Sequence, residues 1–65
     1  MGKDIGEVAG KVYEYLENND KASLSELDKN IGESRSKVYM GIGWLAREDN
    51  IGFDREGRGT HIFLK

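Results

Sequence analysis

The hydrophobic residues of this 65-residue chain change their spacing near residue 50, and this change constrains the fold more than any other feature. In the first helical segment they recur every three or four positions, as in Ile5, Val8, Val12 and Leu16, which is the period of an amphipathic helix. After Asn50, the segments "IGFDR" and "THIFLK" alternate apolar and polar residues, which is typical of half-buried strands. We therefore predict helices followed by a C-terminal β-hairpin.

Capping residues indicate where the first two helices begin. Asp4 with Glu7, and Ser23 with Glu26, have the spacing at which each side chain satisfies a free backbone N–H of the first turn. The polar run "NND" ends the first helix, and the following "KAS" predicts a short extended segment. Gly32 ends the second helix, because glycine readily adopts the positive φ that a helix C-terminus requires.

A third helix is predicted from the N-cap Ser34 to about residue 50, since serine oxygens accept hydrogen bonds from first-turn N–H groups. Its buried stripe consists of Val38, Ile42 and Leu45. Gly41 borders the stripe, and we expect its missing side chain to let the second helix approach closely. The glycines of "EGRG" suit a tight connection between the two strands. The elements together predict a single α+β domain spanning residues 1–65.

Composition limits the functions that such a chain can have. A chain of 65 residues builds only a small core, so a large catalytic cavity is not expected, and dimerisation is a common source of additional stability. The absence of cysteine excludes disulfides and thiolate metal sites, and the lone His61 cannot form a metal cluster. We expect no catalytic residue, cofactor, bound metal or small-molecule substrate.

No apolar run approaches the roughly 20 residues that span a bilayer, and the N-terminal "MGKDIGEV" lacks the apolar region of a signal peptide. We therefore expect a soluble cytoplasmic protein that has no membrane partner. Its net charge of −2 is unevenly distributed, because residues 1–33 carry four lysines against eight acidic residues, and residues 34–65 carry six basic against four acidic residues. An anionic partner would meet the second half. The alternative is an ordinary mixed-charge surface, which the pI near 5.3 favours, because dedicated nucleic-acid binders are usually strongly basic.

The segment "SLSELDKNIGESRSKVYMGIGWLAREDNI" resembles the helix-turn-helix core of winged-helix regulators, with a serine-capped second helix, a glycine turn and a longer third helix. The resemblance covers nearly the whole chain, and "GWLARED" is similar to a family of small, stand-alone prokaryotic winged-helix proteins of largely unassigned function. The resemblance implies a winged helix-turn-helix, with three helices, a short strand between helices 1 and 2, and a C-terminal β-hairpin wing. It also implies a transcription-regulator-like module whose partner is double-stranded DNA.

In DNA-binding winged helices the third helix enters the major groove. Arg35, Ser36 and Lys37 begin this helix, where free N–H groups and the helix dipole favour a phosphate. Arg55 and Arg58 flank the hairpin tip and would complete a two-point phosphate clamp. The predicted DNA-binding residues are Arg35, Ser36, Lys37, Met40, Arg47, Arg55 and Arg58. For Arg47, a surface ion pair with the acidic residues that follow it is the alternative.

The middle of the third helix favours a different function. Met40 and Trp44 form an apolar patch, and Gly43 beside them costs the helix about 1 kcal/mol relative to alanine. Aromatic residues and methionine are enriched in interface cores, so the alternative is a protein-interaction or homodimerisation module that does not bind DNA. A third interpretation places Trp44 over the core beneath the hairpin. The predicted interface residues, which include a stripe on the first helix, are Gly6, Gly10, Tyr13, Met40, Gly43 and Trp44.

Overall fold

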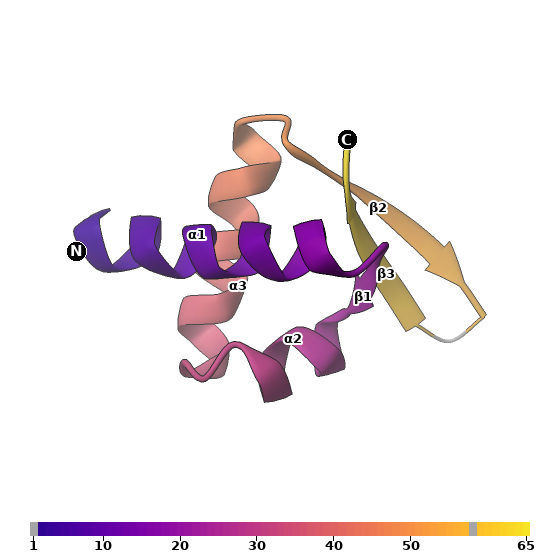
Figure 1. Cartoon of the computed structure of the whole chain (residues 1–65), viewed down its shortest axis with the longest axis horizontal. Coiled ribbons are helices and arrows are strands. Elements are labelled where there is room, and N and C mark those ends of the chain that lie inside the picture. The colour runs from indigo at the N-terminus through magenta and orange to yellow at the C-terminus, as the bar shows by residue number, and fades with distance from the viewer. Residues whose placement is uncertain (1, 58) are drawn as a thin grey trace.

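The computed structural model describes residues 2–57 and 59–65 and contains three helices and three strands (Figure 1). In chain order the elements are α1 (Gly2–Asn18), β1 (Ala22–Ser23), α2 (Leu24–Asn30), α3 (Arg35–Arg47), β2 (Ile51–Glu56) and β3 (Gly59–Leu64). The predicted α+β class, the short strand between the first two helices and the C-terminal hairpin are confirmed.

The three strands form an antiparallel sheet in the order β1-β3-β2. Ala22 of β1 and Phe53 of β2 both pair with Ile62 of the central strand, and Ile62 is completely buried. The hairpin that joins β2 to β3 extends beyond the helices (Figure 1). Glu56 pairs with Gly59 at its end, and Gly57 adopts the positive φ of 59° that a tight hairpin turn requires.

The hydrophobic core lies where α1 crosses in front of α3 and where both helices meet the sheet (Figure 1). The predicted third-helix stripe is buried, together with apolar residues of the other elements. The buried core residues are Val8, Ala9, Val12, Leu16, Ala22, Leu27, Ile31, Val38, Ile42, Leu45, Ile51 and Ile62. Because the helical members recur every three or four positions, each helix presents one apolar face to this core.

Gly41 lies at the crossing of α1 and α3, which corrects the prediction that it accommodates the second helix. A Cβ atom on Gly41 would lie 3.1 Å from the backbone nitrogen of Ala9 and 3.1 Å from Cγ1 of Val8. The element that approaches is therefore α1. The requirement for a small residue was predicted correctly, but the neighbour depends on how the helices cross.

Two of the three predicted helix N-termini are confirmed. Oγ of Ser23 accepts a hydrogen bond from the backbone N–H of Glu26 at 3.1 Å, and Ser34 caps α3 in the same way. Gly32 has the expected positive φ, at 80°. The capping box at Asp4 is wrong, because α1 already includes Gly2 and Asp4 therefore lies inside the first turn.

The third helix ends at Arg47, slightly earlier than predicted. Asp49 adopts a φ of 62°, and the N–H groups of Asp49 and Asn50 donate to the carbonyls of Ala46 and Leu45, both at 3.0 Å. These two bonds form a Schellman motif in which an aspartate takes the position usually held by glycine. The reversal directs the chain into β2.

In the part of the chain that is described, no helix combines the length and the apolar character needed to cross a bilayer.

Candidate nucleic-acid interface

The first turn of α3 contains the basic residues predicted to contact phosphate. Arg35, Ser36 and Lys37 are all exposed there. Ser34 satisfies two N–H groups, since its Oγ accepts from Lys37 at 3.4 Å and its carbonyl accepts from Val38 at 3.0 Å. Within the described residues, the N–H groups of Arg35 and Ser36 have no acceptor. They therefore face outward from the helix end, where the helix dipole favours an anion.

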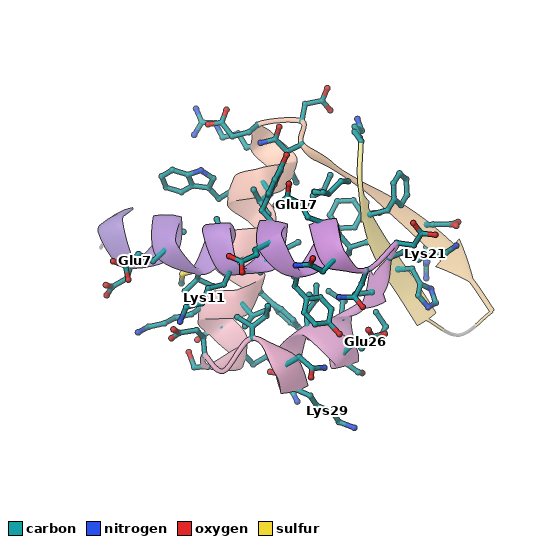
Figure 2. The ribbon with its side chains drawn as sticks, viewed as in Figure 1. Glu7, Lys11, Glu17, Lys21, Glu26 and Lys29 are labelled. Atoms are coloured by element: carbon teal, nitrogen blue, oxygen red, sulfur yellow. The ribbon has the colours of Figure 1, made fainter. Side chains whose placement is uncertain are left out.

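Two acidic side chains border this turn and modify its charge. Oδ2 of Asp28 in α2 lies 3.2 Å from Nε of Arg35. Lys11 extends from α1 towards the start of α3 (Figure 2), and its Nζ lies 2.6 Å from Oε2 of Glu33. The hydrogen bond and charge of Lys11 hold the pKa of the Glu33 carboxyl below its usual value, and Lys37 contributes a smaller effect. A phosphate would have to displace Asp28 from Arg35, whereas Lys37 forms no ion pair with the described residues.

The C-terminal half of α3 has a different character, because it borders an apolar groove of about 590 Å³ beside the start of α1. The groove is lined by Ile5, Met40, Gly43, Trp44, Arg47 and Glu48. Half of the Met40 surface and 44% of the Trp44 surface are exposed. The interpretation in which Trp44 covers the core beneath the hairpin is therefore wrong, because its neighbours across the groove belong to α1.

The wing presents Arg55, whose register partner in β3 is Thr60. Side chains alternate between the two faces of a strand, so Arg55 shares a face with Ile51, which is buried in the core. Arg55 therefore projects from the helix-facing side of the hairpin, and Phe53, which is also exposed, lies on that same side. Arg58, the other predicted wing contact, lies outside the described residues.

The predicted interface residues fall into two groups. Met40, Gly43 and Trp44 line the groove, whereas Gly6, Gly10 and Tyr13 do not. These last three residues share one side of α1 with Glu17, because they are separated by three or four positions. Figure 2 shows Glu17 on the same side of α1 as the C-terminal half of α3. A Cβ atom added to Gly6 or Gly10 would have no neighbour within 4 Å, so this side of α1 is open.

Three features of this region were not predicted from the sequence. The ion pair between Arg35 and Asp28 joins two helices, and the spacing of seven residues gives no signal for it. Ile5 was assigned to the core stripe, but it is only half buried and lines the groove. Phe53 is exposed on the edge strand β2, although its register partner Ile62 in the central strand is buried, and strand alternation alone does not indicate this exposure. Among the described residues, no group of three histidine, cysteine, aspartate or glutamate residues could hold a metal ion.

Three helices and a short strand, followed by a β-hairpin that pairs with that strand, define a winged helix-turn-helix, with α2 and α3 as the helix-turn-helix pair. The chain belongs to the winged helix-turn-helix domain family DUF2582, whose model matches residues 1–64.

Known relatives and solved structures agree with this assignment. An uncharacterised protein of Methanocaldococcus jannaschii, MJ1608, is 52% identical over 68 aligned residues, which cover all of this chain and 96% of the relative. The solution NMR structure of BT2368 from Bacteroides thetaiotaomicron is 32% identical, with a TM-score of 0.85 over 95% of this chain and 76% of that one.

Two more distant structures share the fold. A structure of HOP2, described in terms of DNA recognition and protein interaction domains, has a TM-score of 0.77 at 24% identity and covers 89% of this chain and 98% of that one. Reduced HlyU from Vibrio cholerae has a TM-score of 0.78 at 21% identity, over 89% of this chain and 60% of that one. At these identities the similarity concerns the fold alone.

Proposed function

We propose that this chain acts as a single, non-enzymatic domain that binds double-stranded DNA in a transcription-regulator-like role. The N-terminal turn of α3 contacts the phosphate backbone at the edge of the major groove. The wing contacts the backbone farther along the duplex. The observation that carries the proposal is the coincidence, at one exposed helix end, of two outward-facing N–H groups and the side chains of Arg35 and Lys37.

The proposed phosphate contacts come from two parts of the molecule, the first turn of α3 and the wing. Arg35, Ser36 and Lys37 hold one phosphate stretch, and Arg55 holds another from the helix-facing side of the wing. Phosphate contacts position a protein on a duplex but do not select a sequence. The remaining described members of the predicted DNA-binding set are Met40, near the middle of α3, and Arg47, at its end, and both line the groove.

The charge distribution supports binding that is sensitive to salt. The chain as a whole carries −2, and its positive charge is concentrated in the half that contains α3 and the wing. A surface with this little positive charge neutralises few phosphates. Its affinity for DNA therefore falls as the salt concentration rises, because salt cations compete for the phosphates. HOP2, whose structure is described in terms of DNA recognition, has a domain of the same fold, so this architecture is compatible with such a role.

An amide NMR titration of the labelled protein with a mixed-sequence duplex at low salt tests the proposal. We expect chemical-shift changes concentrated at residues 35–37 and at the wing, and we expect them to diminish as salt is added. The absence of shifts at both places at low salt would contradict DNA binding, because phosphate contacts are strongest under those conditions. Shifts confined to α1 would also contradict it.

A further inference from the structure

The groove between α1 and α3 presents more apolar surface than the DNA-binding proposal explains. Its apolar lining comes from Ile5 near the start of α1 and from Met40 and Trp44 in α3. Met40 and Trp44 remain about half exposed. Tryptophan and methionine are residue types that are enriched in the cores of protein interfaces and depleted from surfaces that remain in water.

Gly43 lines this groove, and no packing contact among the described residues explains why the position is a glycine. A Cβ atom on Gly43 would have no neighbour within 4 Å, whereas a Cβ atom on Gly41 would meet α1. Both glycines disfavour the helix, but only Gly41 is explained by internal packing. Gly43 leaves open space in the groove that the partly exposed Trp44 also lines. The same patch therefore has a large exposed side chain next to a position without one.

The charged lining of the groove is complementary to itself. Arg47 and Glu48 both line it, both are exposed, and neither forms an ion pair with the described residues. A partner of a single charge sign would attract one of them and repel the other. In a twofold dimer the same patch of both copies faces itself, so that Arg47 of each copy can lie against Glu48 of the other.

We propose that the groove binds a second copy of this chain in a twofold dimer. Trp44 of each copy packs over Gly43 of the other, and Arg47 of each copy pairs with Glu48 of the other. Ile5 and Met40 complete the apolar centre. This arrangement assigns Arg47 to the dimer instead of DNA.

The dimer leaves the proposed phosphate site accessible. Arg35 lies twelve residues before Arg47 on the same helix, a separation of about 18 Å at 1.5 Å per residue. The dimer forms with or without DNA, so its tests are independent of whether the chain binds a duplex.

Sedimentation velocity on the full chain, from about 1 μM to about 1 mM, tests the dimer, since this range covers weak and moderate association. We expect the mass to rise from one chain to two. Trp44→Ala should raise the dimer dissociation constant at least about tenfold, as expected for a central interface tryptophan. Tyr39→Ala is the matched control, because Tyr39 lies on the same helix with a similar exposed fraction of 45% but does not line the groove.

Several results would overturn the proposal. One is a mass of one chain at every concentration, and another is a dimer that Trp44→Ala and Tyr39→Ala weaken equally. Circular dichroism establishes that each variant remains folded. Gly43→Ala should weaken the dimer while its monomer keeps its helical signal, and an unchanged dissociation constant for this variant would contradict the contact between Trp44 and Gly43.

Charge reversal tests the twofold arrangement directly. Arg47→Glu and Glu48→Arg should each weaken self-association, because each places like charges opposite one another. Mixing the two variants should restore association, since each copy then meets a partner of opposite charge. If the mixture sediments as monomers under conditions in which the wild type is dimeric, the pairing of Arg47 with Glu48 is wrong.

Discussion

The two ends of α3 differ in nearly every physical property, although both face away from the core. The N-terminal turn is polar and basic, with outward-facing N–H groups and an ion pair to α2. The C-terminal half borders an apolar groove and includes a glycine with no internal role. One helix can therefore serve two partners, because the dipole and the free N–H groups favour an anion at one end only. The four predictions below test this division.

The largest effect is expected from removing the charges at the N-terminal end. The double substitution Arg35→Ala with Lys37→Ala should reduce affinity for duplex DNA at low salt by at least about tenfold. It should also lower the slope of log affinity against log salt by about 2, one for each phosphate contact. Fluorescence anisotropy with a labelled duplex at several salt concentrations measures both quantities.

The control for this experiment is Lys29→Ala, because Lys29 is an exposed lysine of α2 that Figure 2 shows pointing away from the rest of the molecule. It removes one positive charge without touching α3. Trp44→Ala should also leave the affinity nearly unchanged if the two ends of the helix act separately. An equal loss for Lys29→Ala would mean that only net charge matters, and the N-terminal site would be disproved.

The second prediction compares the two glycines of α3, only one of which packs against another helix. Gly41→Val should lower the free energy of unfolding by about 1–3 kcal/mol, because the added atoms would overpack the crossing with α1. Gly43→Val is the matched change at an exposed position, and it should keep the free energy of unfolding of the monomer within about 1 kcal/mol of the wild type. Urea denaturation measures the free energy of unfolding of both variants, at protein concentrations too low for the chain to dimerise. Equal destabilisation would show that Gly43 is packed after all.

These glycines illustrate how much of the fold could be predicted from the sequence. Caps and helix stops are local, so Ser23, Ser34 and Gly32 indicated their elements directly. The period of the apolar residues predicted the third-helix stripe and the hairpin. Gly41 was recognised as a position that requires a small residue, but its neighbour was misassigned, because helix crossing is a property of the whole molecule.

The candidate site was less predictable for the same reason. Helical spacing placed Trp44 outside the buried stripe but could not indicate what lies beside it. Ile5 has the correct spacing for the core, yet it lies before the point where α1 crosses α3, so it is only partly buried and lines the groove. The pairing of Arg35 with Asp28 joins two helices, and only the packed structure brings these residues together.

That ion pair supplies the third prediction. Asp28→Asn should raise affinity for duplex DNA by about twofold to fivefold, because Arg35 no longer has to leave a partner when it binds a phosphate, and exposed ion pairs contribute at most about 1 kcal/mol. Asp20→Asn changes the net charge equally at an exposed position away from α3 and serves as the control. If both variants gain the same affinity, Asp28 acts only through net charge.

The smallest effect concerns the pH dependence of stability near the same turn. The hydrogen bond from Lys11 holds the pKa of Glu33 below its usual value, so the folded state favours the ionised carboxylate. The resulting stabilisation is fully present above the pKa of the unfolded chain and is lost as the pH falls through the folded pKa. Lys11 stays protonated throughout this range, because the ordinary pKa of lysine, 10.5, lies far above it and the same contact raises the pKa further.

We therefore expect Glu33→Gln to flatten slightly the decline in melting temperature between about pH 6 and about pH 3, where glutamates titrate. Glu17→Gln is the control, because Glu17 lies on the other side of α1 from Lys11 (Figure 2). Thermal denaturation followed by circular dichroism across this range provides the comparison. If Glu33→Gln and Glu17→Gln follow the same curve, the contact with Lys11 does not stabilise the turn before α3, and the start of that helix is held by its cap and by the pair between Arg35 and Asp28 alone.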